Sequence, residues 1–265
     1  MSRLASIFSQ PSRTALIPYV TVGYPTIEAT LEVVPRLASG GCDIIELGIP
    51  FSDPLADGAT IQRASFGALQ NGVNPQLCLE VAKQLSRQVK IPLVFMTYLN
   101  PVLSYGLEEF CHACAGSGID GLIIPDLPPE EGSELEAITQ REGLDLIYLL
   151  APTSTEERIR LVAQKSRGFI YVVSVTGVTG GRSKLPDSLE AFVGRVRKIT
   201  PKPLCVGFGI STPEQAGQVA RMADGVIVGS QIIQLMETED SLTAVGHFIR
   251  ELRCALDESS QAEKR

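Results

Sequence analysis

The chain has 265 residues, with 23 Lys and Arg against 30 Asp and Glu, which gives a formal net charge of −7. Hydrophobic residues make up 44% of it and charged residues 20%, a balance that allows a large buried core and excludes a chain that is disordered as a whole. The acidic balance argues against nucleic-acid binding, which needs a basic face. No apolar run approaches the roughly 20 residues that span a bilayer, and the N-terminus lacks the apolar region of a signal peptide, so we expect a cytoplasmic protein that is not membrane-bound.

Short apolar runs rich in β-branched residues alternate along the chain with amphipathic segments. The runs predict strands at 17–22, 44–49, 92–96, 121–125, 146–150, 169–173, 204–208 and 225–228. The amphipathic segments predict helices at 27–39, 75–89, 106–117, 131–142, 154–166, 187–199, 212–221 and 240–256. Nearly continuous apolar strands are typical of parallel sheets that are buried on both faces. The pattern therefore predicts an α/β fold, a (β/α)₈ TIM barrel that forms one domain over residues 1–265, with a polar tail at 257–265 that we expect to fray.

Two acidic residues follow the second predicted strand, at the end of the barrel where such folds carry their chemistry. Glu46 lies within an apolar strand, where burial raises the pKa of a carboxyl and suits it to proton transfer near neutral pH. The alternative is a Glu46 that pairs with Lys or Arg in the barrel wall. Asp57 belongs to an Asp-Gly pair, which is more often only a turn. Together the two residues supply acids in unlike environments, and hence two roles.

Glycine-rich segments follow the last three predicted strands, at 174–182, 207–211 and 229–230. Backbone N–H groups of such loops, and of a helix that begins there, bind phosphate in many barrels. The alternative is that these glycines serve only tight turns. Tyr171, in the sixth strand, is a candidate for hydrogen bonding to a substrate or for core packing. Residues that could line a flat aromatic pocket, or equally pack in the core, are Tyr19, Met96, Tyr98 and Phe208.

The segment Cys111-His112-Ala113-Cys114 invites a metal-site interpretation. The two cysteines fall in a predicted helix, with no second cysteine pair and no clustered histidine to complete the roughly four ligands that zinc requires. We therefore expect core cysteines and no metal.

Residues 46–58 (ELGIPFSDPLADG), together with 174–180 and 207–211, resemble the tryptophan synthase alpha subunit family. The resemblance runs from about Leu4 to about Ala255. Four further segments fall in the matching order along the chain, namely 18–21, 100–101, 125–128 and 229–230.

The resemblance implies a lyase of tryptophan biosynthesis that cleaves indole-3-glycerol phosphate by a retro-aldol reaction into indole and glyceraldehyde 3-phosphate, with no metal or organic cofactor in this chain. It implies that Glu46 shuttles protons, that Asp57 stabilises the indole N–H, and that Tyr171 assists by hydrogen bonding. The implied phosphate ligands are Thr179, Gly180, Gly209, Gly229 and Ser230. The implied indole pocket consists of Tyr19, Met96, Tyr98 and Phe208.

The family also implies a partner, a beta subunit that carries pyridoxal phosphate, takes up the indole through a tunnel and forms an alpha2-beta2 heterotetramer. The implied docking face comprises residues 53–60, Asn100-Pro101 and Pro128. One departure is Ala59, where the family usually has proline, so the loop is expected to be looser or the coupling to the partner altered.

Two other functions remain as alternatives. One is a non-catalytic, phosphate-ligand-binding regulatory subunit of the same complex, against which the presence of both Glu46 and Asp57 argues. The other is a different phosphate-binding barrel enzyme, such as a sugar-phosphate isomerase, against which the absence of a strand-end Lys or His argues.

Overall fold

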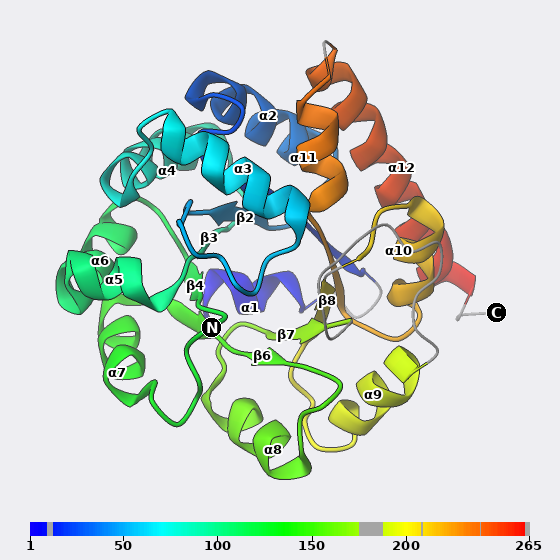
Figure 1. The fold of residues 1–265 in the computed structure, drawn as a ribbon. Helices are drawn as coiled ribbons and strands as arrows, with labels where there is room; N and C mark the ends of the chain where they lie inside the picture. The colour runs from blue at the N-terminus through cyan, green and yellow to red at the C-terminus, as the bar shows by residue number, and fades with distance from the viewer. Residues whose placement is uncertain (10–12, 175–187, 208, 239, 263–265) are drawn as a thin grey trace.

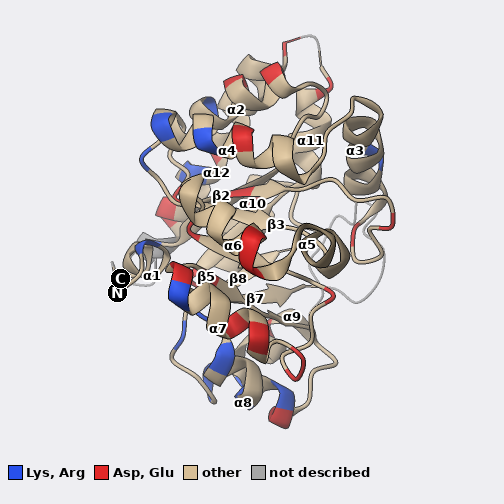
Figure 2. Cartoon of the chain, turned by 90° about the vertical axis from the view of Figure 1, so that its left-hand side faces the viewer, with Lys and Arg blue, Asp and Glu red and all other residues tan. Residues whose placement is uncertain are grey.

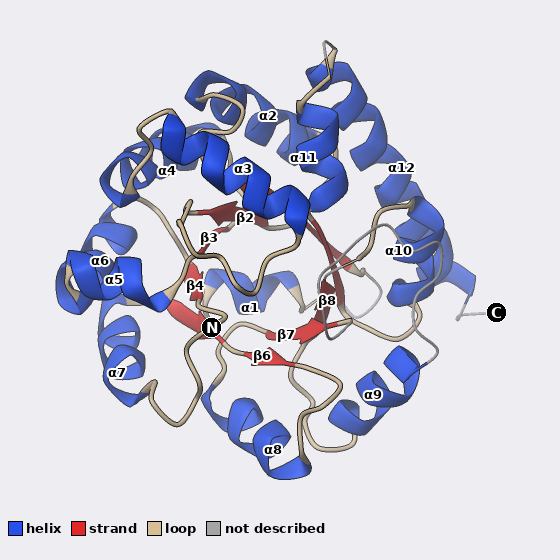
Figure 3. Cartoon of the chain, viewed as in Figure 1, coloured by secondary structure: helices blue, strands red, loops and turns tan. Residues whose placement is uncertain are grey.

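The structure is a computed structural model that describes residues 1–9, 13–174, 188–207, 209–238 and 240–262, with side chains described as far as residue 259. It has an inner ring of parallel strands and an outer ring of helices, as Figures 1 and 3 show. The strands are β1 (Ala15–Thr21), β2 (Ile45–Gly48), β3 (Leu93–Met96), β4 (Gly121–Ile123), β5 (Asp145–Ile147), β6 (Leu149–Leu150), β7 (Ile170–Val173), β8 (Leu204–Gly207) and β9 (Gly225–Val228).

The sheet order is β5-β4-β3-β2-β1-β9-β8-β7-β6, and every printed pairing is parallel. Its two outermost strands are consecutive in sequence, separated only by Tyr148. Tyr148 is 1% exposed, and its carbonyl accepts a hydrogen bond from the backbone N–H of Tyr171 at 3.1 Å. The predicted strand 146–150 is thus one run divided in two, with one half paired to β4 and the other to β7. This division closes the barrel, and the predicted TIM-barrel fold is confirmed.

The helices that surround the barrel follow the amphipathic pattern. Thr26, Thr155 and Thr212 each accept a backbone N–H three residues later, at 3.1, 3.2 and 3.3 Å, so side-chain caps fix the starts of three of them. The helices are α1 (Arg3–Ile7), α2 (Ile27–Ser39), α3 (Ala59–Gln70), α4 (Pro75–Gln88), α5 (Leu99–Tyr105), α6 (Leu107–Gly116), α7 (Ser133–Glu142), α8 (Glu156–Lys165), α9 (Ser188–Arg197), α10 (Pro213–Ala220), α11 (Ser230–Met236) and α12 (Ser241–Ala262).

The structure departs from the predicted elements in two ways. The helices α1, α3, α5 and α11 were not predicted; three of them have no more than seven residues, too short for a clear helical period. The expected frayed tail is wrong for residues 257–262, because α12 continues to Ala262. Arg253 and Asp257, one turn apart in this helix, form an ion pair at 2.7 Å, and Leu256 is completely buried.

The two ends of the barrel differ in what covers them. The short helix α1 lies across one end, visible through the barrel in Figure 1 and at the left in Figure 2. The opposite end carries α3 and the loop that precedes it, which cross the mouth of the barrel. This second end holds the carboxyl termini of the strands, where the candidate site lies. No helix in the described part of the chain is long and apolar enough to cross a membrane.

Candidate active site

Glu46 lies in the middle of β2, in register with Tyr19 of β1 and Val94 of β3. Its side chain is completely buried, and neither carboxylate oxygen has a hydrogen-bond partner among the described residues. Burial, followed by the charge of Asp57, raises the pKa of Glu46 to about 8. The alternative of a wall residue paired with Lys or Arg is therefore wrong, since a buried carboxyl without a cation is stable only when it is protonated.

Asp57 lies on the loop between β2 and α3, and it is 9% exposed. The loop turns here through a hydrogen bond from the Asp57 N–H to the Pro54 carbonyl at 3.0 Å, so the turn interpretation is correct for the backbone. The side chain has a further role, because its Oδ2 accepts a hydrogen bond from the Tyr98 hydroxyl at 3.1 Å. Burial raises the pKa of Asp57 to about 6, and the Tyr98 hydrogen bond opposes that rise. The structure thus brings together two acids with different pKa values.

Two buried tyrosines face these acids across the barrel mouth. Burial, then the charges of Glu46 and Asp57, raises the pKa of Tyr171. A Cβ atom on Gly207 would lie 2.4 Å from the Tyr171 hydroxyl, and one on Gly48 would lie 2.0 Å from the Tyr19 hydroxyl. The glycines that end β8 and β2 therefore leave the space that these two hydroxyl groups occupy.

The predicted pocket wall is buried where the structure describes it. Tyr19, Met96 and Tyr98 are between 5% and 7% exposed, and Phe208 lies outside the described residues. The Tyr19 hydroxyl pairs with the Thr21 hydroxyl at 3.2 Å rather than with either acid. Sequence reasoning missed Phe51, whose ring lies 5.3 Å from that of Tyr98 at an angle of 30°. The only sequence signal for Phe51 is its place within the segment 46–58.

The predicted phosphate rim is described in part. Thr179 and Gly180 lie outside the described residues. Gly209 is exposed and has φ +78°, a left-handed conformation that favours glycine. Gly229 precedes α11, which begins at Ser230, and a Cβ atom on Gly229 would lie 3.3 Å from the Cβ of Tyr19. Gly229 therefore lies close behind Tyr19, on the β9 side of the barrel.

The remaining candidates have structural roles. Cys111 and Cys114 are completely buried, as expected of core cysteines, while exposed His112 lies 3.1 Å from Glu142. Asp126 accepts the Leu99 N–H at 2.9 Å and so holds the start of α5. Among the residues that the structure describes, no group of three His, Cys, Asp or Glu side chains could hold a metal ion.

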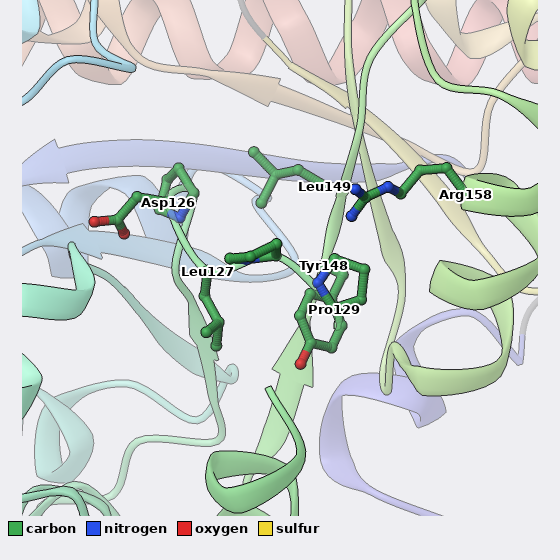
Figure 4. A pocket seen from close by; sticks show the side chains of 8 residues that line it. Asp126, Leu127, Pro129, Tyr148, Leu149 and Arg158 are labelled. Carbon is green, nitrogen blue, oxygen red and sulfur yellow. The ribbon is translucent and has the colours of Figure 1, made fainter. Parts of the chain in front are cut away.

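A cavity of about 350 Å³ lies beside the acids, at the same end of the barrel. It lies between the loop after β4 and the first turn of α8, and Figure 4 shows Arg158 extending from α8 toward Tyr148 and Leu149. It contains neither Glu46 nor Asp57. Its lining consists of Pro125, Asp126, Leu127, Pro128, Pro129, Tyr148, Leu149 and Arg158.

Comparison with known proteins gives a consistent result. The sequence model of the family described as tryptophan synthase alpha chain matches residues 6–260. A tryptophan synthase alpha chain from Dehalococcoides mccartyi is 59% identical over 257 residues, which cover 97% of this chain and all of that one. The corresponding protein from Geobacter sulfurreducens is 49% identical over 89% of this chain and 91% of its own length.

Solved structures agree with the sequence comparisons. A structure of Mycobacterium tuberculosis tryptophan synthase has a TM-score of 0.90 at 40% identity, over 97% of this chain and 98% of the other. A tryptophan synthase subunit alpha from Legionella pneumophila has a TM-score of 0.91 at 37% identity, over 97% and 99%. Both the residues of the barrel mouth and the comparisons over nearly the whole length lead to one assignment: the chain belongs to the tryptophan synthase alpha chain family.

Proposed function

We propose that this chain is the lyase that its family membership indicates, and that it cleaves indole-3-glycerol phosphate into indole and glyceraldehyde 3-phosphate with Glu46 and Asp57 as its acids. The observation that carries the proposal is the state of Glu46, which is completely buried and unpaired within the described structure, beside a second carboxyl of lower pKa. Burying such a group without a partner is costly, and proton transfer gives it a purpose.

The two pKa values assign the roles. At neutral pH Glu46 is mostly protonated and Asp57 mostly ionised, because their pKa values are about 8 and about 6. Glu46 gives its proton to C3 of the indole ring, which places positive charge on the ring nitrogen. The Asp57 carboxylate stabilises that charge at the N–H.

The second half of the reaction restores Glu46. The Glu46 carboxylate takes the proton of the glycerol-chain hydroxyl next to the ring, and the oxygen forms the aldehyde as the carbon–carbon bond breaks. The electron pair of that bond returns to the ring and neutralises the cation, which releases indole. Tyr171, buried beside both acids, is positioned to assist by hydrogen bonding.

The phosphate group is proposed to lie on the opposite rim, held by Gly209, Gly229 and Ser230 together with Thr179 and Gly180. Support comes from α11, whose first residue is Ser230, since the N-terminal N–H groups of a helix favour an anion. The exposed, left-handed Gly209 presents its backbone on the same side. The indole ring would then lie between this rim and the wall formed by Tyr19, Met96, Tyr98 and Phe208.

Membership of the family implies a complex with a beta subunit, and we propose the stoichiometry alpha2-beta2, with pyridoxal phosphate in the partner only and none in this chain. The proposed docking face comprises residues 53–60, Asn100-Pro101 and Pro128. It exposes two large apolar side chains, Leu55 at 92% and Leu103 at 54%, which a partner would cover. Pro128 also lines the cavity of Figure 4, which would extend this face. Cytoplasmic localisation stays a prediction.

Ala59, the departure from the family pattern, is the first residue of α3, with Gly58 as the N-cap. Proline is favoured at this position because its fixed φ suits a first helical turn. An alanine here leaves the helix intact but constrains the preceding loop less, which is the loop that carries Asp57 and the proposed docking face.

The test is to incubate the purified chain with indole-3-glycerol phosphate and to measure indole and glyceraldehyde 3-phosphate, alone and with a beta subunit. We expect equimolar products, formed faster with the partner present. Asp57→Asn should lower kcat/KM by about 10²–10³-fold while circular dichroism is unchanged. Saturable binding of the substrate without cleavage, with and without the partner, would instead favour the non-catalytic regulatory subunit.

A further inference from the structure

Tyr98 has a hydrogen-bonding role that the pocket-wall interpretation does not include. We propose that Tyr98 is a positioning residue that holds the Asp57 carboxylate toward the reacting ring. The inference rests on the proposed function, which it deepens by naming the group that orients one of the two acids.

Tyr98 is itself firmly held. It follows β3 directly and is the N-cap residue of α5, so its backbone is fixed between a strand and a helix. The next residue, Leu99, donates its N–H to Asp126 at 2.9 Å. The ring is 5% exposed and lies against Phe51. An anchor of this kind, on the rigid barrel, can define the position of a group on a loop.

The direction of the Tyr98 hydroxyl proton follows from its two partners. The Ala56 N–H donates to the Tyr98 oxygen at 3.0 Å, and the hydroxyl lies 3.1 Å from Oδ2 of Asp57. Because the N–H occupies the oxygen as an acceptor, the single phenolic proton is directed at the carboxylate. One hydroxyl thereby fixes both the loop backbone and the acid that the loop carries.

The rest of the Asp57 environment leaves this role to Tyr98. The titratable groups that face Asp57 are Glu46 from β2, Tyr19 from β1, Tyr171 from β7 and Tyr98. None of them is a cation. Gln62 of α3 contacts Asp57 through the main chain only, donating its amide to the Asp57 carbonyl at 2.9 Å. In the described structure, the Tyr98 hydroxyl is the side-chain donor recorded on the Asp57 carboxylate.

A hydrogen bond to a carboxylate favours its ionised form, so removing it raises the pKa and frees the side chain to rotate. Tyr98→Phe keeps the ring, and hence the packing against Phe51, but removes the hydroxyl. Tyr105→Phe is the matched control: this tyrosine ends α5 and donates to Gln76 at 2.8 Å, away from the acids.

The experiment has two readouts. The first is a ¹³C NMR titration of aspartate carboxyl groups in the ligand-free full chain, with Asp57 assigned by its absence in Asp57→Asn. We expect the pKa of Asp57 to rise by about one pH unit in Tyr98→Phe and to stay unchanged in Tyr105→Phe. The second is the pH profile of kcat/KM for indole release. Its acidic limb should move upward with the Asp57 pKa, and kcat at pH 7 should fall by about tenfold with little change in KM.

The outcomes separate the two proposals. An Asp57 pKa that is the same in Tyr98→Phe and the wild type overturns the positioning role, and so does a loss of activity that appears in KM alone, which would indicate only a binding wall. Absence of indole release by the wild-type chain with its partner overturns the proposed function instead. The NMR titration still tests the Tyr98 hydrogen bond in that case, because it needs no substrate.

Discussion

Asp43 and Glu46 lie three residues apart, one before β2 and one within it, and both are buried. Asp43 has three partners: Nε of Arg13 at 2.8 Å, Nη1 of Arg253 at 3.1 Å and the N–H of Leu16 at 2.8 Å. Glu46 has none among the described residues. Asp43 begins β2 at the end of the barrel that α1 covers, whereas Glu46 lies toward the end that carries the loop with Asp57.

The same contrast extends across the two ends of the barrel. At the α1 end, Arg3 lies 3.0 Å from Asp120, and Ser2 donates to Asp145. These carboxylates stabilise the fold because each has a donor or a cation. At the other end, the two acids are buried with one tyrosine hydroxyl between them. The comparison teaches that burial alone does not mark a site; burial of an acid without a cation does.

The largest effect that would break this comparison is expected at Glu46. Glu46→Gln keeps the shape of the side chain and removes its proton transfer, so kcat should fall by about 10³-fold or more. Circular dichroism should be unchanged. The control is Glu80→Gln, on the exposed face of α4, which should retain wild-type kcat. Wild-type turnover in Glu46→Gln would remove the mechanism.

At the α1 end the same kind of change should affect stability and spare activity. Arg253→Met deprives Asp43 of one buried cation, and the free energy of unfolding should fall by about 2–4 kcal/mol. Urea denaturation measures this. Arg250→Met, on the exposed face of the same helix, should change it by less than about 0.5 kcal/mol. A loss of similar size in both variants would mean that Arg253 contributes only as any residue of α12 does.

The pH dependence of stability sharpens the comparison. The pKa of Glu46 is about 8 in the folded chain, above its value in the unfolded chain, so the folded state binds this proton more tightly. Its stabilising contribution is therefore present at low pH and is lost as the pH rises toward and through 8. Between pH 6 and pH 9 the wild type should lose about 2–3 kcal/mol relative to Glu46→Gln. Parallel stability curves for the two proteins would contradict the raised pKa.

Much of the barrel is predictable from the sequence, because buried parallel strands are continuous apolar runs. The run 225–228 coincides with β9, and 27–39 coincides with α2. The burial of Glu46 is predictable for the same reason, since its neighbours in the run are all apolar. Helices such as α3 were missed because residues 59–70 were interpreted only as part of a functional loop.

Other features depend on contacts between distant residues, which no local pattern reveals. The hydrogen bond from Tyr98 to Asp57 joins residues 41 positions apart, so the sequence indicated a wall residue and not a hydrogen-bond donor. The break at Tyr148 follows from closure of the barrel, which requires one run to pair with two different strands. The continuation of α12 past Leu256 depends on an ion pair within the helix that a polar composition does not distinguish from a frayed end.

The central claim is that Glu46 is a buried, unpaired acid that carries a proton at neutral pH. Its most direct test is a ¹³C NMR titration of the glutamate carboxyl groups in the ligand-free chain, with Glu46 assigned by the signal that is absent in Glu46→Gln. We predict half-protonation at a pH of about 8. A Glu46 signal that titrates about where an exposed glutamate does, at pH ~4.3, would contradict the account, because the group would then be ionised at neutral pH and unable to protonate the indole ring.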